Sequence, residues 1–334
     1  MAAKDDAEDS IEGVLVIDKP TGPTSHDVVG KLRRTLRMKR IGHAGTLDPM
    51  ASGVLVMLLG QATKLGPYLT LHDKRYDARV LFGRQTDSLD VQGTIVAEAE
   101  VPDWLKQEIA RLAADSATTD APRIRAALEH ERARKAQTPP AYSAIKVDGQ
   151  RSYDRARRGE EVVLEDRPVD VKSIDVIGAG FVEDGRLGFL DVSLDVSKGY
   201  YVRSWARDLG QTLGVPSSLG ALRRTRSGPF ELEESAKLDA ARHDLAARVV
   251  PMAQAVDRCM AVATLTPSGV VRASQGKLLS ALDFSALPAS SPEPFAWLSP
   301  EGALVAIGEA EQDGFVVRRG FPLGRTPLLD ESRV

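Results

Sequence analysis

The sequence has a single cysteine, Cys259, among its 334 residues. One cysteine excludes an internal disulfide framework and any zinc site built from clustered cysteines. The sequence also has no apolar run near the ~18 residues that a membrane-spanning helix needs. Its first residues are acidic, whereas targeting segments are basic. We therefore expect no membrane association and a cytoplasmic location.

Motifs for cofactors are missing as well. The chain has no Gly-x-x-x-x-Gly-Lys-Ser/Thr phosphate loop, no dinucleotide-binding glycine fingerprint after a strand, and no His-x-Glu or Cys-x-x-Cys pair of a zinc deaminase. His43, one of five histidines, has no partner at metal-ligand spacing. We expect neither a metal nor a cofactor.

An excess of positive charge, typical of nucleic-acid-binding proteins, is also missing, because the formal net charge is -3. The charges are segregated, however. Residues 123–135 carry five basic residues against two acids, and residues 31–40 carry six basic residues and no acid. The six are Lys31, Arg33, Arg34, Arg37, Lys39 and Arg40. They predict a basic helix that binds a polyanion, and the alternative is a solvated helix face.

The chain length fits one large domain with a smaller one. We predict a disordered acidic leader at residues 1–11 and a large domain at residues 12–260. That domain contains an insertion at about residues 103–138, which is helical with a break at residues 114–122. Residues 262–330, with short strand patterns and a Pro/Ser stretch, predict a small β-rich domain.

Sequence periodicity predicts both strands and helices. An apolar run at residues 13–17 and alternating patterns at residues 76–82 and 190–196 are typical of strands. Helical spacing follows the expected N-cap Thr24 and recurs at residues 202–213. Residues 42–49, with two glycines and a proline, predict a loop that precedes a return to the core.

Three residues are candidates for chemistry. Asp48 lies in the Gly-rich loop, where a ligand can approach closely, although Asp-Pro also marks ordinary turns. Arg203 shares a face with Tyr201 at a predicted strand-to-helix junction, an arrangement suited to base stacking and ion pairing. A solvated arginine is the alternative there. Tyr76 begins a predicted strand, and its alternative is a half-buried core tyrosine.

Six segments then match a known family in its order. They are residues 13–25 (a Lys-Pro-x-Gly-x-Thr-Ser motif), 42–53, 73–76, 84–93, 140–146 and 197–203. On these motifs the sequence resembles the bacterial TruB-type tRNA pseudouridine synthases over roughly residues 12–230. Two departures are Ala44, where Thr or Ser is frequent, and a longer segment at residues 112–135.

The resemblance implies an α+β pseudouridine synthase fold, with a mixed, mostly antiparallel central sheet flanked by helices and loops. It also implies a PUA-like RNA-binding domain at residues 262–330. The implied activity is isomerisation of U55 in the tRNA T-loop to pseudouridine. The enzyme would flip the base, cleave the N1–C1′ bond and join C5 to C1′, a reaction with no net gain of atoms or electrons. No cofactor is needed for such a reaction.

The resemblance also assigns the site residues. Asp48, Tyr76 and Arg203 are expected to be catalytic. The reaction needs a carboxylate as nucleophile or base, an apolar slot for the detached uracil and a cation that keeps the carboxylate ionised. By resemblance, Arg203 pairs with Asp48 and Asp90, and His43 props the vacated site. The expected substrate-binding residues are His43, Tyr201, Asp90, Lys19, Leu222 and Lys146, and the six cations of residues 31–40 are expected to hold the RNA backbone.

Several alternatives stay open at this point. The chain could be a tRNA-binding folding chaperone with secondary catalysis, a guide-RNA-dependent relative of the family, or an N-glycosidase that only releases the base. Asp48 could attack C1′, attack C6 or abstract a sugar proton. The expected partner is the tRNA T-arm, with no obligatory protein partner and a monomeric protein.

Overall fold

A nine-stranded sheet forms the centre of the computed structural model, which describes residues 11–143, 146–147, 150–151, 155, 158, 164–289 and 293–323. All of its strand pairings are antiparallel except β13 with β3 and β1 with β15. Its order is β11 (Val171–Val182), β12 (Leu187–Val196), β4 (Lys74–Phe82), β13 (Ser217–Ser227), β3 (Ser52–Leu59), β1 (Gly13–Lys19) and β15 (Ala236–Lys237), with β14 (Phe230–Glu231) on β13 and β2 (Ile41–Ala44) on β3. The predicted α+β class with a mixed, mostly antiparallel sheet is confirmed.

The two faces of the sheet contribute to different cores. Strand β4 turns Tyr76, Ala78 and Val80 to one face, as its alternating sequence predicts, and these residues join the larger core. That core includes residues of the helices α1 (Ser25–Leu36), α3 (Asp103–Ala114), α4 (Pro122–Arg132) and α6 (Val202–Leu213). Val16 and Val56 face the other way. Their core includes residues of η1 (Gly60–Leu65), α2 (Gly66–Leu69) and α8 (Met252–Asp257).

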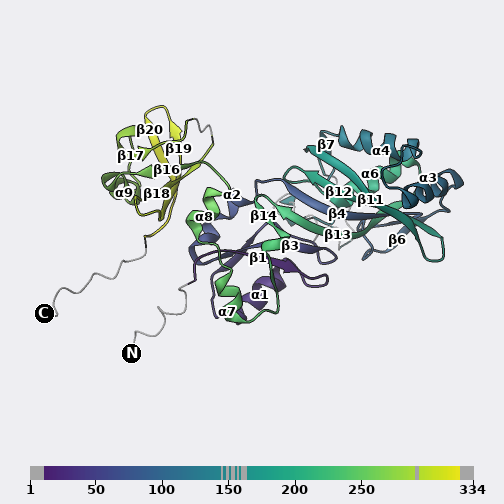
Figure 1. Cartoon of the computed structure of the whole chain (residues 1–334), viewed down its shortest axis with the longest axis horizontal. Coiled ribbons are helices and arrows are strands. Elements are labelled where there is room, and N and C mark those ends of the chain that lie inside the picture. Colours follow the sequence, from purple (N-terminus) through teal and green to yellow (C-terminus); the bar gives the residue numbers. More distant parts are fainter. Residues whose placement is uncertain are drawn as a thin grey trace.

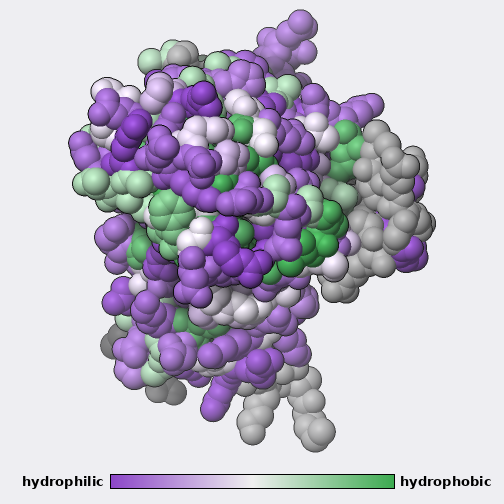
Figure 2. Space-filling model, turned by 90° about the vertical axis from the view of Figure 1, so that its right-hand side faces the viewer, coloured by the Kyte–Doolittle hydropathy of each residue, from purple (hydrophilic) through white to green (hydrophobic). Residues whose placement is uncertain are grey.

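The predicted insertion contains α3 and α4 followed by β7 (Ala136–Gln137), which pairs with β10 (Arg167–Pro168). The hairpin of β5 (Arg84–Thr86) and β6 (Ile95–Glu98) lies toward the same end of the molecule (Figure 1). Figure 2 shows this end as a mainly hydrophilic surface with separate hydrophobic patches. The short strands β8 (Lys146–Val147) and β9 (Gln150–Arg151) form a further pair.

The C-terminal segment forms a second unit at the other end of the molecule (Figure 1). Its five-stranded sheet has the order β17 (Phe284–Ala286), β16 (Val262–Leu265), β18 (Phe295–Leu298), β19 (Leu304–Glu311) and β20 (Gly314–Gly320). Helix α9 (Pro267–Ser274) and the turn η3 (Ala281–Asp283) cover it, and its core includes Phe284, Phe295 and Trp297. The β-rich character predicted for this segment is confirmed.

Other short elements complete the described chain. They are η2 (Leu232–Glu234) and α7 (Arg242–Ala247), which packs on α1. The predicted leader lies outside the described residues, except that Ile11 packs against the larger core. No helix within the described ranges is long and apolar enough to cross a membrane.

Two local predictions were wrong. The predicted loop 42–49 begins as strand β2, because every residue from Ile41 to Ala44 pairs with β3 and both ends of the strand are buried. Pairing along a long neighbour outweighs the low strand preference of Gly42. The basic helix ends at Leu36, because Arg37 adopts a left-handed conformation with φ 58°. Arg37, Lys39 and Arg40 therefore lie beyond the helix.

Candidate active site

Asp48 and Arg203 form an ion pair at the centre of the candidate site. Arg203 Nε lies 2.9 Å from Asp48 Oδ2 and 3.8 Å from Asp90 Oδ2. The side chains of Arg203 and Asp90 are 8% and 7% exposed, whereas that of Asp48 is 32% exposed. One buried cation thus lies between two carboxylates, and only Asp48 is open to an incoming molecule.

The remaining donors of Arg203 are bound to the backbone. Its Nη1 donates to the Ser88 carbonyl at 3.1 Å and its Nη2 donates to the Tyr142 carbonyl at 2.9 Å. Asp90 is held in turn, because its Oδ1 accepts from Ser88 Oγ at 2.8 Å and from the Gln92 N–H at 3.0 Å. Such a network restricts the guanidinium to one orientation.

Residues of α1 and β1 hold the loop at residues 45–51, called here the Asp48 loop. Ser25 Oγ donates to the Leu47 carbonyl and accepts from its N–H. Lys19, fully buried, donates from Nζ to the carbonyls of Ala51 at 2.7 Å and Pro49 at 3.4 Å. Burial lowers the pKa of Lys19 to about 8, against the opposing effect of Asp48. The structure thus places Lys19 beneath the loop.

Arg224 on β13, which the sequence analysis missed, holds the other side of the Asp48 loop. It is 1% exposed, and it donates to the carbonyls of Val54 at 2.7 Å, Gly45 at 3.2 Å and Thr46 at 3.3 Å. Its neighbour Arg223 points to the opposite face, where it binds Asp18. No local signal in the sequence separates these two adjacent arginines.

Tyr76 and Leu222 lie on the same sheet face as Arg224. Tyr76 is opposite Arg224 in the register of β4 and β13, and Leu222 is opposite Ala78. Both side chains are largely buried in the larger core, with exposures of 8% and 7%. The face therefore offers an aromatic ring and an aliphatic side chain on the strands beside the Asp48 loop.

His43 and Tyr201 lie near the same charges. His43, on β2, has a buried Nδ1 without a hydrogen-bond partner in the described part of the chain. Burial lowers its pKa, and Arg224 and His26 add to the effect, so the imidazole is neutral at pH 7. Burial raises the pKa of the Tyr201 phenol, which also senses the charges of Arg203 and Asp48. Both residues therefore belong to this neighbourhood.

The other predicted residues are dispersed. Lys146 lies in β8, and its side chain is outside the described part of the chain. Lys31 lines a separate cavity with Asp18 and Lys237. Arg33 donates to the Ile41 carbonyl, and Arg40 donates to Thr63. The remaining cations of the basic run are exposed: Arg34, Arg37 and Lys39.

Among the described residues, no three His, Cys, Asp or Glu side chains come together as a group that could hold a metal ion. The geometry is that of a partly exposed carboxylate on a rigid loop, paired with a buried guanidinium and bordered by an aromatic ring. Such a carboxylate is oriented and accessible, as a nucleophile or general base requires.

Comparisons with known proteins point to one family. A model described as TruB family pseudouridylate synthase (N terminal domain) matches residues 33–202. A tRNA pseudouridine synthase B of Opitutus terrae is 43% identical over 249 residues, which cover 73% of this chain and 95% of that protein. Its counterpart from Thermobifida fusca is 41% identical over 302 residues, covering 89% and 94%.

Solved structures share the fold. An H/ACA RNP bound to a substrate RNA containing 2′-deoxyuridine matches with a TM-score of 0.64 over 93% of this chain and 85% of that chain, at 24% identity. A Cbf5-Nop10-Gar1 complex matches with a TM-score of 0.61 over 89% and 78%, at 26% identity. The matched regions include both the central sheet and much of the rest of the chain.

Proposed function

The chain belongs to the TruB family of pseudouridylate synthases, and on this premise we propose that it converts U55 in the T-loop of tRNA to pseudouridine. The printed names of its relatives support tRNA as the substrate. The observation that carries the proposal is the ion pair of Asp48 with the buried Arg203, on a loop whose carbonyls are bound by Lys19 and Arg224.

In the proposed reaction Asp48 is the catalytic carboxylate. Arg203 orients it, because the guanidinium Nε lies 2.9 Å from Asp48 Oδ2. The N1–C1′ bond breaks, the uracil turns within the pocket, and C5 forms a bond to C1′. The proton on C5 is released and N1 takes up a proton, so the atoms balance. Tyr76 and Leu222 supply the apolar walls that keep the detached base in place.

Flipping a uridine out of a folded T-arm costs a few kcal/mol. Stacking on Tyr76 and Tyr201 offsets part of this cost. We propose that His43, whose buried Nδ1 has no hydrogen-bond partner among the described contacts, fills the space that the base leaves. We assign Asp90 the role of holding Arg203, and we assign Lys19 the support of the Asp48 loop rather than direct substrate contact, since it is fully buried.

The T-arm phosphates are proposed to bind the exposed cations of residues 34–39 and the insertion at 103–138. The unit from residue 262 onward is proposed to act as a PUA-like RNA-binding domain. We propose that the protein works as a monomer in the cytoplasm, where its tRNA substrate is found. Relatives that match along nine tenths of their length favour a stand-alone enzyme over one that depends on a guide RNA.

Tritium release from [5-³H]uridine-labelled tRNA tests the proposal directly. The wild-type protein, without guide RNA, metal or cofactor, is expected to release tritium and to yield pseudouridine mapped to the T-loop. Asp48→Asn should abolish release while tRNA affinity stays within about threefold, because the amide keeps the shape of the side chain but not its charge.

Other outcomes would point elsewhere. Product formation by Asp48→Asn would contradict the role of the carboxylate. Tight tRNA binding without release by either protein would favour the chaperone or the guide-dependent alternative. Free uracil without pseudouridine would favour an N-glycosidase.

A further inference from the structure

The segment that follows α4 binds the first turn of α6, the helix that supplies Arg203. Thr138 offers its carbonyl to Ser204 Oγ at 2.8 Å and to Arg207 Nη2 at 3.3 Å. Gln137, one residue earlier, is 2% exposed and belongs to β7. These two residues lie more than sixty positions from α6 in sequence, so their contacts are built by the fold.

The side chain of Gln137 makes two hydrogen bonds to one residue. Its Nε2 donates to the Tyr201 carbonyl at 3.1 Å, and its Oε1 accepts from the Tyr201 N–H at 2.9 Å. A carboxamide used in this way imitates the partner of an extended strand, and Tyr201 has the matching extended backbone, with φ -108° and ψ 105°. Tyr201 is also the N-cap residue of α6 and makes no side-chain cap bond.

This pair of hydrogen bonds fixes the start of α6, and two site residues project from there. Tyr201 carries the phenol, and Arg203, two residues later, carries the guanidinium that meets Asp48 at 2.9 Å. A rotation of the Tyr201 backbone would move both groups relative to the Asp48 loop. We infer that Gln137 is a positioning residue: its carboxamide sets the Tyr201 backbone and so aims the Arg203 guanidinium at Asp48.

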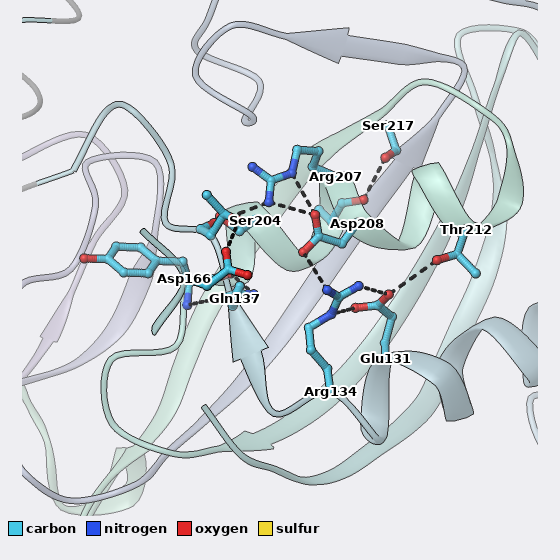
Figure 3. A network of polar contacts seen from close by, with 12 residues as sticks. Glu131, Arg134, Gln137, Asp166, Ser204, Arg207, Asp208, Thr212 and Ser217 are labelled. Carbon is cyan, nitrogen blue, oxygen red and sulfur yellow. Dashed lines mark hydrogen bonds and ion pairs between the residues drawn. The ribbon is translucent and has the colours of Figure 1, made fainter. Parts of the chain in front are cut away.

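The rest of α6 has its own anchors. Glu131, fully buried, accepts two hydrogen bonds from Arg134 at 2.7 and 2.8 Å, and Arg134 Nη1 lies 3.8 Å from Asp208 Oδ2 (Figure 3). Asp208 is also bound by Arg207. These contacts hold the middle of the helix against α4. Loss of the Gln137 side chain should therefore disturb the first turn locally without releasing the helix.

Two variants of Gln137 distinguish a positioning role from general structural support. The test rests on the proposed function, because it measures pseudouridine formation. Gln137→Met keeps the volume and removes both hydrogen bonds. We expect the single-turnover rate of pseudouridine formation to fall at least about tenfold, because small misplacements of catalytic groups are costly. The tRNA Kd should stay within about threefold. Gln254→Met, at an exposed position on α8 outside the proposed RNA-binding regions, is the matched control and should keep the wild-type rate.

Gln137→Glu supplies a readout that a loss of packing would not give. The ionised carboxylate can accept from the Tyr201 N–H but repels its carbonyl, whereas the protonated acid can donate to that carbonyl as the amide does. The charged groups nearby are Arg167, opposite in the strand register, Arg207 and Asp166, which both bind Thr138, and Arg203. We expect the rate of Gln137→Glu relative to the wild type to rise severalfold as the pH falls from 8 to 5.5, with no such change in Gln254→Glu.

The outcomes distinguish the two proposals. If the wild-type protein forms no pseudouridine, the proposed function fails and the role of Gln137 in it fails too. If the wild type is active, an unchanged rate in Gln137→Met, or an equal loss of rate and tRNA affinity, overturns the inference alone. Should the methionine variant not fold, a pH-independent ratio for Gln137→Glu overturns it equally.

Discussion

At the scale of single residues, two buried cations are used to hold backbone rather than carboxylates. Lys19 on β1 and Arg224 on β13, the strands on either side of β3, reach the Asp48 loop and bind carbonyls at both of its ends. Burying a charge is costly unless hydrogen bonds satisfy it. Both cations meet that condition mostly through this loop and its flanks, with one further bond from Lys19 Nζ to the Pro20 carbonyl at 2.9 Å, so the loop conformation and the buried charges depend on each other.

Removal of Arg224 should therefore damage catalysis and stability together. Arg224→Met leaves the carbonyls of Gly45, Thr46 and Val54 without this donor, and we expect a loss of about 2 kcal/mol or more in the free energy of unfolding. The single-turnover rate should fall about a hundredfold as the Asp48 loop relaxes. Chemical denaturation and tritium release measure the two effects.

Arg223→Met is the control for that variant, because Arg223 binds Asp18 on the opposite face and Lys237 can still pair with Asp18. Its rate should stay near that of the wild type. An Arg224→Met protein with the wild-type rate would show that the loop holds its shape without this arginine.

Lys19 predicts a pH dependence of stability. Its pKa is about 8 in the folded protein, below its usual 10.5, mainly because of burial. Between these values the unfolded chain binds more protons than the folded one, so the free energy of unfolding should increase with pH. Lys19→Met should flatten this increase between pH 8 and 10, whereas Lys39→Met, at an exposed position, should not. Urea titrations across this range measure the slope, and equal slopes in all three proteins would contradict the prediction.

At the scale of elements, the sequence predicted the main strands and helices and the fold class. The strands β4 and β12 and the helix α6 have clean periodicity, so their burial could be predicted from their own residues. Strand β2 was missed because its pairing with β3 decides its conformation. The low strand preference of Gly42 does not indicate this pairing. The motif resemblance predicted the ion pairs of Arg203 with Asp48 and Asp90, and both are present.

The contributions of Gln137 and Arg224 could not be predicted in this way. Each acts through hydrogen bonds to backbone atoms more than sixty positions away. No residue type or spacing near them marks such a contact. Likewise, the charge run 31–40 could not show that Arg37 leaves the helix, since basic side chains carry no signal for a left-handed helix C-cap.

The exposed cations at the end of α1 lead to a prediction for RNA binding. Arg34 and Arg37 are exposed, whereas Arg33 donates to the Ile41 carbonyl and is unsuitable for a test. Arg34→Gln with Arg37→Gln should weaken tRNA binding and reduce the slope of log K against log salt by about 1–2, because each phosphate contact contributes about 0.9. Filter binding at several salt concentrations measures the slope.

Arg242→Gln with Arg248→Gln is the matched control, because these arginines, at the first residue and the C-cap of α7, are also exposed. Its slope should equal that of the wild type. If the two double variants change the slope equally, the basic run of α1 is only a solvated surface.

At the scale of the whole molecule, the two units share an apolar seam. The core that contains Val16 and Val56 of the central sheet also contains Leu304, Ile307 and Phe321 of the C-terminal segment. A polar contact borders it, because Lys64 Nζ donates to the Gly320 carbonyl at 3.0 Å and lies 5.5 Å from the centre of the Phe321 ring. A continuous core of this kind makes the units unfold together.

Phe321 tests this coupling, because it is 4% exposed and lies at the seam. Phe321→Ala should lower the free energy of unfolding by about 3–5 kcal/mol, as expected for a buried phenylalanine, and should separate one calorimetric transition into two. Leu282→Ala, at an 89% exposed position in the same unit, should change it by less than about 0.5 kcal/mol. A single transition in Phe321→Ala with the wild-type midpoint would mean that the units fold independently of this seam. Two transitions with unchanged tritium release would instead place the chemistry wholly in the larger unit, so that the seam serves to hold the C-terminal unit in a fixed position for binding RNA.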